Sequence, residues 1–185
     1  VSRLLLAAGL LSRHTRAVDV REVTLERGAV HLAAQLDALP VYRPDAELLQ
    51  AVRDAIAAHP YLTADDRRTV GVDVADGVAH LSGNVRTPQA EASVRDAAAS
   101  VPGVSEVRSA VVDDRALETA VGRALDAAGM FRHGRLYVRA ALGEVTLEGY
   151  ISKAGPAADI VKAAAAVPGV RSVVDRMEVA PAAPA

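Results

Sequence analysis

The sequence predicts an α+β protein made of two tandem α-β-β-α-β modules, each a small three-stranded mixed sheet with two helices packed on one face. Two repeated phrases predict this architecture. "DVADGVAHLSGNV" at 73–85 shares its alternation and its two glycines with "RAALGEVTLEGYI" at 139–151. "AAASVPGVSEV" at 97–107 recurs as "AAAAVPGVRSV" at 163–173. Both pairs are 66 residues apart, and one offset for two different motifs indicates a duplicated module.

A helix is expected at the start of each module. In the first, Asp45 is placed to cap the free N–H groups of the first turn, and Pro60 ends the helix because it cannot continue the hydrogen-bond ladder. In the second, Gly129 stands where a left-handed C-cap falls. Both helices carry an apolar stripe with helical spacing, formed by Leu48, Val52 and Ile56 in the first module and by Leu117, Val121, Leu125 and Ala128 in the second.

A hairpin follows each of these helices. Gly77, after Asp76, and Gly143 stand at the two turns, since Asp-Gly is a strong hairpin signal. Each second strand then carries another glycine, Gly83 or Gly149. The alternation in the second copy places this glycine on the core side, where its small size is expected to admit a helix.

The last part of each module is a helix followed by a strand. Thr87-Pro88 predicts the start of the first of these helices. The helices end at Pro102-Gly103 in the first module and at Pro168-Gly169 in the second. Where a crossover helix joins two strands of one sheet, the two strands are expected to run parallel.

The modules are predicted to span residues 44–113 and 114–180, with a disordered tail over 181–185. Residues 1–43 are predicted to be an accessory segment in which a helix at the start precedes a hairpin that packs against the first module. "EVTLERGAVHLAAQL" at 22–36 matches the hairpin of the first module in length and glycine position. A degenerate third repeat and a piece of another domain are the two alternatives for this segment.

Composition excludes several function classes. The chain has no cysteine, which excludes disulfides, thiolate zinc sites and a cysteine nucleophile. A formal net charge of −2 and aromatic residues at 3% disfavour nucleic-acid binding, which relies on basic surplus and base stacking. No stretch approaches the roughly 20 apolar residues that span a bilayer.

Candidate catalytic and metal-ligating residues are few. The histidines form no recognised ligand motif, so no metal site and no cofactor are predicted. These histidines are His14, His31, His59, His80 and His133. Asp65-Asp66, followed by Arg67-Arg68, is either a carboxylate pair for acid–base chemistry or a solvated charge cluster in a polar loop. The second interpretation is favoured, and no enzymatic activity is predicted.

One patch suggests a binding function. Met130, Phe131, Arg132 and His133, with Arg135 close behind, place the only Phe of the chain among basic groups at the end of a helix. An apolar tip with basic neighbours suits an anionic membrane surface. The alternative is that Phe131 fills the core of the module.

The two hairpins together with "VPGVSEV" and "VPGVRSV" resemble the BON domain family, in an OsmY-like tandem arrangement over about residues 44–180. The first copy matches the family pattern closely, whereas the second departs from it at Glu144 and Glu148. The resemblance implies a non-enzymatic bacterial module, often periplasmic or envelope-associated, linked to osmotic protection and to phospholipid binding. Some relatives are cytoplasmic, and one group binds potassium. Residues 1–43 more weakly resemble the end of a PRC-barrel-like segment.

The function expected from these features is binding of phospholipid surfaces or envelope components in a stress or osmotic-protection role. The alternative is a soluble cytoplasmic scaffold or sensor that binds a protein partner or a cation. We expect a periplasmic or cell-envelope location if a signal segment precedes Val1, and a cytoplasmic one otherwise.

Overall fold

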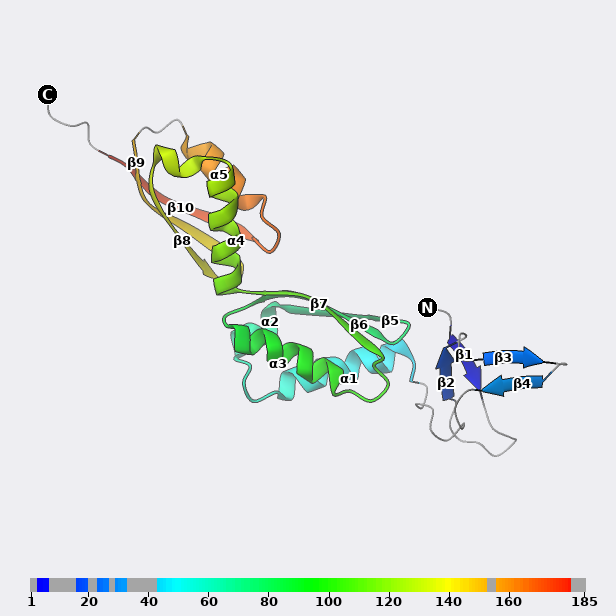
Figure 1. The fold of residues 1–185 in the computed structure, drawn as a ribbon. Coiled ribbons are helices and arrows are strands. Elements are labelled where there is room, and N and C mark those ends of the chain that lie inside the picture. The colour runs from blue at the N-terminus through cyan, green and yellow to red at the C-terminus, as the bar shows by residue number, and fades with distance from the viewer. Residues whose placement is uncertain are drawn as a thin grey trace, which may run out of the picture. The chain divides into compact units, whose positions relative to one another are not determined.

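The computed structural model describes residues 43–152 and 156–180 and four short strands before them (Figure 1). It divides into two compact units, one over residues 1–59, 72–81 and 95–109 and the other over residues 60–71, 82–94 and 110–185. The division therefore passes through the first repeat. Within the described ranges, no helix is both long and apolar enough to cross a membrane. The tail predicted over 181–185 lies outside the described residues.

The N-terminal segment contributes two separate strand pairs. Strands β1 (Arg3–Leu6) and β2 (Arg16–Asp19) pair antiparallel, as do β3 (Val23–Glu26) and β4 (Ala29–Leu32). The prediction of a helix at the start of the chain is therefore wrong, because strand β1 forms there. The hairpin predicted over 22–36 matches β3 and β4, while its packing on the first module stays a prediction.

The first repeat contains three helices and three strands. The helices are α1 (Asp45–Ala58), α2 (Ala64–Thr69) and α3 (Pro88–Ala99), and the strands are β5 (Val70–Ala75), β6 (Val78–Val85) and β7 (Glu106–Asp113). The sheet order is β5-β6-β7. Leu48, Val52 and Ile56 are buried, as the helical stripe predicts. The N–H of Ala90 donates to the Thr87 hydroxyl at 3.1 Å, which confirms the predicted start of α3.

The second repeat has the same order of elements. It comprises α4 (Asp114–Ala127), the 3-10 helix η3 (Met130–His133), β8 (Gly134–Ala141), β9 (Glu144–Ile151), α5 (Ala157–Ala165) and β10 (Ser172–Val179). Strand β9 lies between β8, to which it runs antiparallel, and β10, to which it runs parallel. The predicted mixed sheet with a parallel strand–helix–strand connection is thus confirmed.

Both helices of the second repeat pack on one face of its sheet (Figure 1). The buried residues between the helices and the sheet are all aliphatic. Side chains of this size are enough to fill the space between two short helices and three strands. This core is formed by Leu117, Val121, Leu125, Leu136, Val145, Leu147, Ile151, Ile160 and Ala164. The opposite face of the sheet carries the exposed residues of β8 and β9.

The first residue of each opening helix binds the hairpin turn. Asp45 makes no side-chain cap on α1; its carboxylate accepts the N–H groups of Asp76 and Gly77, at 2.8 and 2.9 Å. The predicted helix cap is therefore wrong. In the second repeat, Asp114 accepts the N–H of Leu142 at 2.6 Å. Burial raises the pKa of Asp114, although this hydrogen bond acts in the opposite direction.

The two glycines that recur in both repeats have different roles. Gly77 and Gly143 have positive φ at the hairpin turns, as predicted. In the second repeat, the later glycine does not admit a helix. A Cβ on Gly83 would lie 2.0 Å from the carbonyl oxygen of Thr69, and one on Gly149 would lie 2.0 Å from that of Arg135. The close backbone belongs to strand β8 in the second repeat, and to the last residue of α2, next to the start of β5, in the first.

The Pro-Gly motifs lead each second helix into the last strand. Gly103 and Gly169 both have positive φ. The residue two positions after each glycine then donates its N–H to the hairpin turn, Ser105 to the Gly77 carbonyl at 2.9 Å and Arg171 to the Gly143 carbonyl at 2.8 Å. The motif therefore places the start of the last strand beside the turn of the hairpin in each repeat.

Candidate functional site

The two repeats differ clearly in the segment that joins the opening helix to the hairpin. At the offset of 66 residues, positions 64–67 correspond to 130–133. The first repeat forms α2 here and the second forms η3. The segment holds "ADDR" in one copy and "MFRH" in the other, so this single place in the module carries two different surfaces.

In the second repeat, the change of direction before η3 depends on Gly129. This residue adopts φ 66°, in the left-handed region, which confirms the predicted cap, and its N–H donates to the Asp126 carbonyl at 2.8 Å. Met130 then packs against the aliphatic core. Phe131 remains 37% exposed. The interpretation in which Phe131 fills the core is therefore wrong; of the two neighbours, it is the partly buried Met130 that contacts the core.

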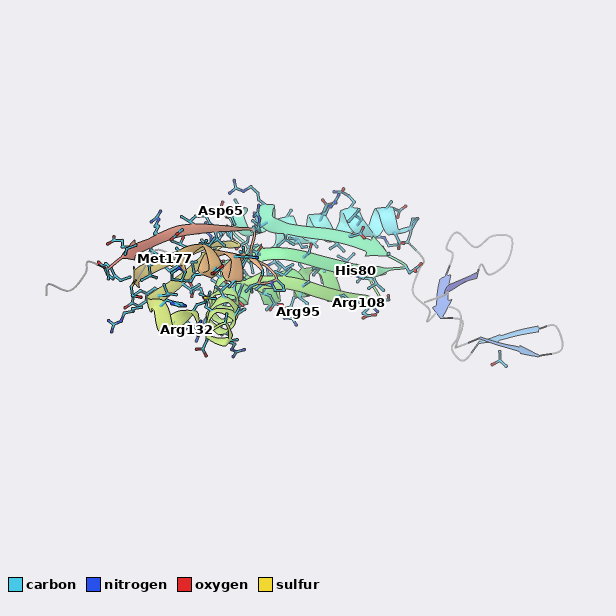
Figure 2. All side chains as sticks on the ribbon, turned by 90° about the horizontal axis from the view of Figure 1, so that it is seen from above. Asp65, His80, Arg95, Arg108, Arg132 and Met177 are labelled. Atoms are coloured by element: carbon cyan, nitrogen blue, oxygen red, sulfur yellow. The ribbon has the colours of Figure 1, made fainter. Side chains whose placement is uncertain are left out.

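Basic groups follow the exposed ring in the sequence, and one of them, Arg132, is labelled in Figure 2. Arg132 and Arg135 are both exposed. The Nε of Arg132 donates to Nε2 of His133 at 3.2 Å, and the His133 carbonyl accepts the N–H of Ser152 at 2.7 Å. Among the residues that the structure describes, neither arginine has a carboxylate partner. The segment from Met130 to Arg135, called here the η3 patch, thus combines an apolar ring with uncompensated positive charge.

The equivalent segment of the first repeat is a short capped helix. Thr63 and Asp66 form a capping box, in which the Asp66 N–H donates to the Thr63 hydroxyl oxygen at 3.2 Å and the Asp66 carboxylate accepts from the Thr63 N–H at 3.1 Å and its hydroxyl at 2.6 Å. The other carboxylate oxygen accepts the N–H of Arg86 at 2.9 Å. The polar loop predicted for this segment is therefore wrong.

The environment of Asp66 opposes acid–base catalysis. Its side chain is buried, and burial by itself disfavours the charged form. The hydrogen bonds from Thr63 and Arg86 outweigh that effect and lower the pKa of Asp66. A general acid at neutral pH needs a raised pKa. Its neighbour Asp65 forms ion pairs with Arg68 and Arg86. The two carboxylates therefore stabilise structure.

Metal-ligating groups are dispersed over the described part of the chain. His59 follows α1, His80 lies on β6 and His133 ends η3. His14 and the side chain of His31 lie outside the described residues. Within residues 43–152 and 156–180, no three His, Cys, Asp or Glu residues are grouped to hold a metal ion.

Two surface depressions lie away from the η3 patch. One of about 410 Å³ is lined by Pro88 and the first turns of α4, with Arg115 and Arg123. The other, of about 620 Å³, is lined by Arg68, Thr69 and residues of the β8–β9 turn and the start of β10. Neither contains a residue of the η3 patch.

Asn84 is a structural contact that the sequence did not predict. Its side chain is buried and its Nδ2 donates to the Gly169 carbonyl at 3.0 Å. A strand of the first repeat thereby bonds to the Pro-Gly turn of the second, within one compact unit. The only available signal was polarity, since Asn84 interrupts the apolar pattern at the end of β6.

Comparison with known proteins is consistent with this architecture. Two solved structures of CdsD, a structural protein of the type III secretion system of Chlamydia trachomatis, resemble the chain with TM-scores of 0.61 and 0.58, each at 19% identity. They match 76% and 75% of this chain, which spans 65% and 68% of theirs. This likeness establishes a shared fold. No curated protein matches the sequence.

The sequence profile that describes the BON domain matches the chain twice, over residues 44–112 and 113–181. The two matches follow each other directly and together cover both copies of the α-β-β-α-β module. The chain belongs to the BON domain family and carries two BON domains in tandem.

Proposed function

We propose that this tandem BON-domain protein is a non-catalytic binding module that docks on anionic phospholipid surfaces through the η3 patch of its second domain. The observation that carries the proposal is the exposed Phe131 ring beside Arg132 and Arg135, neither of which has a carboxylate partner among the described residues. A role in envelope stress or osmotic protection, in the periplasm or cell envelope, is the setting that the family suggests for such binding.

The expected affinity is modest. Each basic residue near an anionic bilayer contributes about 1 kcal/mol. Complete burial of a Phe side chain contributes about 1.5–3 kcal/mol, and Phe131 is already partly covered, so its share is smaller. Binding should therefore be reversible, should require anionic lipid and should weaken as salt screens the arginines.

Reversing the character of the η3 patch should abolish membrane binding. We expect the double variant Phe131→Asp, Arg132→Glu to lose at least about tenfold in affinity for anionic vesicles, because it removes an inserting ring and turns attraction into repulsion. The measurement is co-sedimentation of the full chain with vesicles of phosphatidylglycerol and phosphatidylcholine, beside phosphatidylcholine alone.

Arg115→Glu is the matched control. Arg115 is an exposed arginine in the first turn of α4, about 20 Å along the helix axis from η3. Its replacement changes the net charge without touching the η3 patch, so binding should stay near that of the unmodified protein. Binding that survives the double variant, or that is absent from the unmodified protein, contradicts the proposal.

The second candidate function is a scaffold that binds a protein partner. The observation that favours it is the placement of tyrosines on the surface, since Tyr61, Tyr137 and Tyr150 are all exposed and tyrosine is enriched at protein interfaces. For a cation as the partner, the described part of the chain offers no group of three His, Cys, Asp or Glu residues that could hold one. An unbiased pull-down, with titration calorimetry against K⁺ and Ca²⁺, separates it from lipid binding.

A further inference from the structure

The open face of the second sheet carries an organised set of large side chains. Strand β8 exposes Arg135, Tyr137 and Arg139, which alternate with residues that face the core. The register places Arg135 opposite Tyr150 and Tyr137 opposite Glu148. Tyr137 and Tyr150 are therefore diagonal neighbours, close enough to contact one another. Helices α4 and α5 cover the other face, so none of the described helices of this repeat covers the tyrosines.

These aromatic side chains contribute little to the stability of the fold. Every aromatic side chain that the structure describes is exposed, Tyr61, Phe131, Tyr137 and Tyr150 alike, and the buried hydrophobic residues are all Ala, Val, Leu or Ile. A tyrosine that is 55% exposed, as Tyr137 and Tyr150 are, leaves apolar area available for a partner. Tyrosine and arginine are also the residue types most enriched where protein partners bind.

The first repeat presents the complementary surface on its equivalent strand. Strand β5 exposes Gly71, Asp73 and Ala75. At the offset of 66 residues these positions correspond to Tyr137, Arg139 and Ala141. A glycine thus stands where the other copy has a tyrosine, and a carboxylate where it has a guanidinium. Small and acidic residues on one strand match large and basic residues on the other.

The two opposite charges are available for a contact between molecules. Asp73 has no ion-pair partner among the residues that the structure describes. Arg139 makes a long 3.6 Å contact with Glu148 and stays 75% exposed, so the pair is weak. Over residues 46–113, moreover, ten Asp and Glu residues outnumber six Arg, which gives the first repeat an acidic surface overall.

We propose that a second copy of this chain is the partner of the open β8–β9 face, and that it docks through the β5 face of its own first repeat. The contact is heterologous, since two different surfaces meet. The resulting pair keeps one free β5 face and one free β8–β9 face, so further copies add head to tail. The two surfaces share Arg135, but self-association can be tested apart from the lipid binding proposed above, because Asp73, Tyr137 and Arg139 lie outside the η3 patch.

A charge exchange between copies tests the proposal. Arg139→Asp and Asp73→Arg each place like charges in the contact, so each variant alone should associate at least about tenfold more weakly than the unmodified chain. In an equal mixture, each reversed face meets an opposite charge on the other variant, and association should return. Size-exclusion chromatography with light scattering over a wide concentration range, without lipid, measures the mass.

Two further variants separate an effect of the proposed contact from a general effect of changed charge. Arg123→Asp alters an exposed arginine on α4, on the helical side of the sheet, and should associate like the unmodified chain. Tyr137→Ser removes an exposed ring without changing charge, and should weaken association too. Circular dichroism confirms that each variant is folded. An unmodified chain that stays monomeric at every concentration, or a mixture that fails to restore association, overturns the proposal.

Discussion

Replacing Gly149 by alanine should lower the free energy of unfolding by about 3 kcal/mol. Gly149 has φ 122°, and a Cβ there would lie 2.0 Å from the carbonyl oxygen of Arg135 on the neighbouring strand. A side chain in this conformation costs about 1–3 kcal/mol. Forcing the strands apart adds about 1–3 kcal/mol more. Urea denaturation of the full chain, followed by circular dichroism, measures the loss.

Gly122→Ala is the matched control for this substitution. Gly122 lies in the middle of α4, and nothing stands within 4 Å of the position that its Cβ would take. Alanine is favoured over glycine in a helix by about 1 kcal/mol. The control should therefore be as stable as the unmodified protein or slightly more so. Equal effects of the two substitutions would show that β8 and β9 tolerate a side chain at Gly149.

Replacing Asp66 by alanine should cost about 2–3 kcal/mol of stability, because its carboxylate accepts three hydrogen bonds that the alanine side chain cannot make. The side chain is only 2% exposed, so water does not readily reach the N–H groups that are left without a partner. The expected readout is a lower urea midpoint at neutral pH. Asp65→Asn is the control, since surface ion pairs contribute about 0–1 kcal/mol.

Acid should remove the contribution of Asp66 in the unmodified protein. The pKa of Asp66 is lowered in the folded state from its ordinary value of 3.8, so the folded protein binds the proton less readily than the unfolded chain. Its stabilisation is complete above that ordinary value and is lost as pH falls through the lowered one. The stability difference between the unmodified protein and Asp66→Ala should therefore shrink in strong acid. A difference that stays constant there would contradict the assigned hydrogen bonds.

Much of the fold followed from local patterns. The offset that pairs Gly77 with Gly143 revealed the duplication, and turn chemistry located both hairpins. The stripe through Leu117, Val121 and Leu125 identified a buried helix face because helical periodicity depends on neighbours in sequence alone. The family resemblance rested on the same motifs.

The candidate site was only partly predictable. The sequence singled out the η3 patch by composition, since one Phe among basic residues is unusual in this chain. It did not decide whether Phe131 or Met130 enters the core, because both side chains are apolar and they are adjacent. In the structure a partly buried Met130 packs against the core and Phe131 stays exposed.

The sequence by itself determined the repeated architecture, the turns and the aliphatic character of both domains. Only the tertiary structure decided the partners of the polar and glycine positions. Asp45 binds a turn 31 residues away, Asp66 binds the backbone 20 residues away, and Gly149 faces a neighbouring strand where a helix was expected. Propensity and periodicity report on neighbours along the chain, whereas these contacts exist only after folding brings distant segments together.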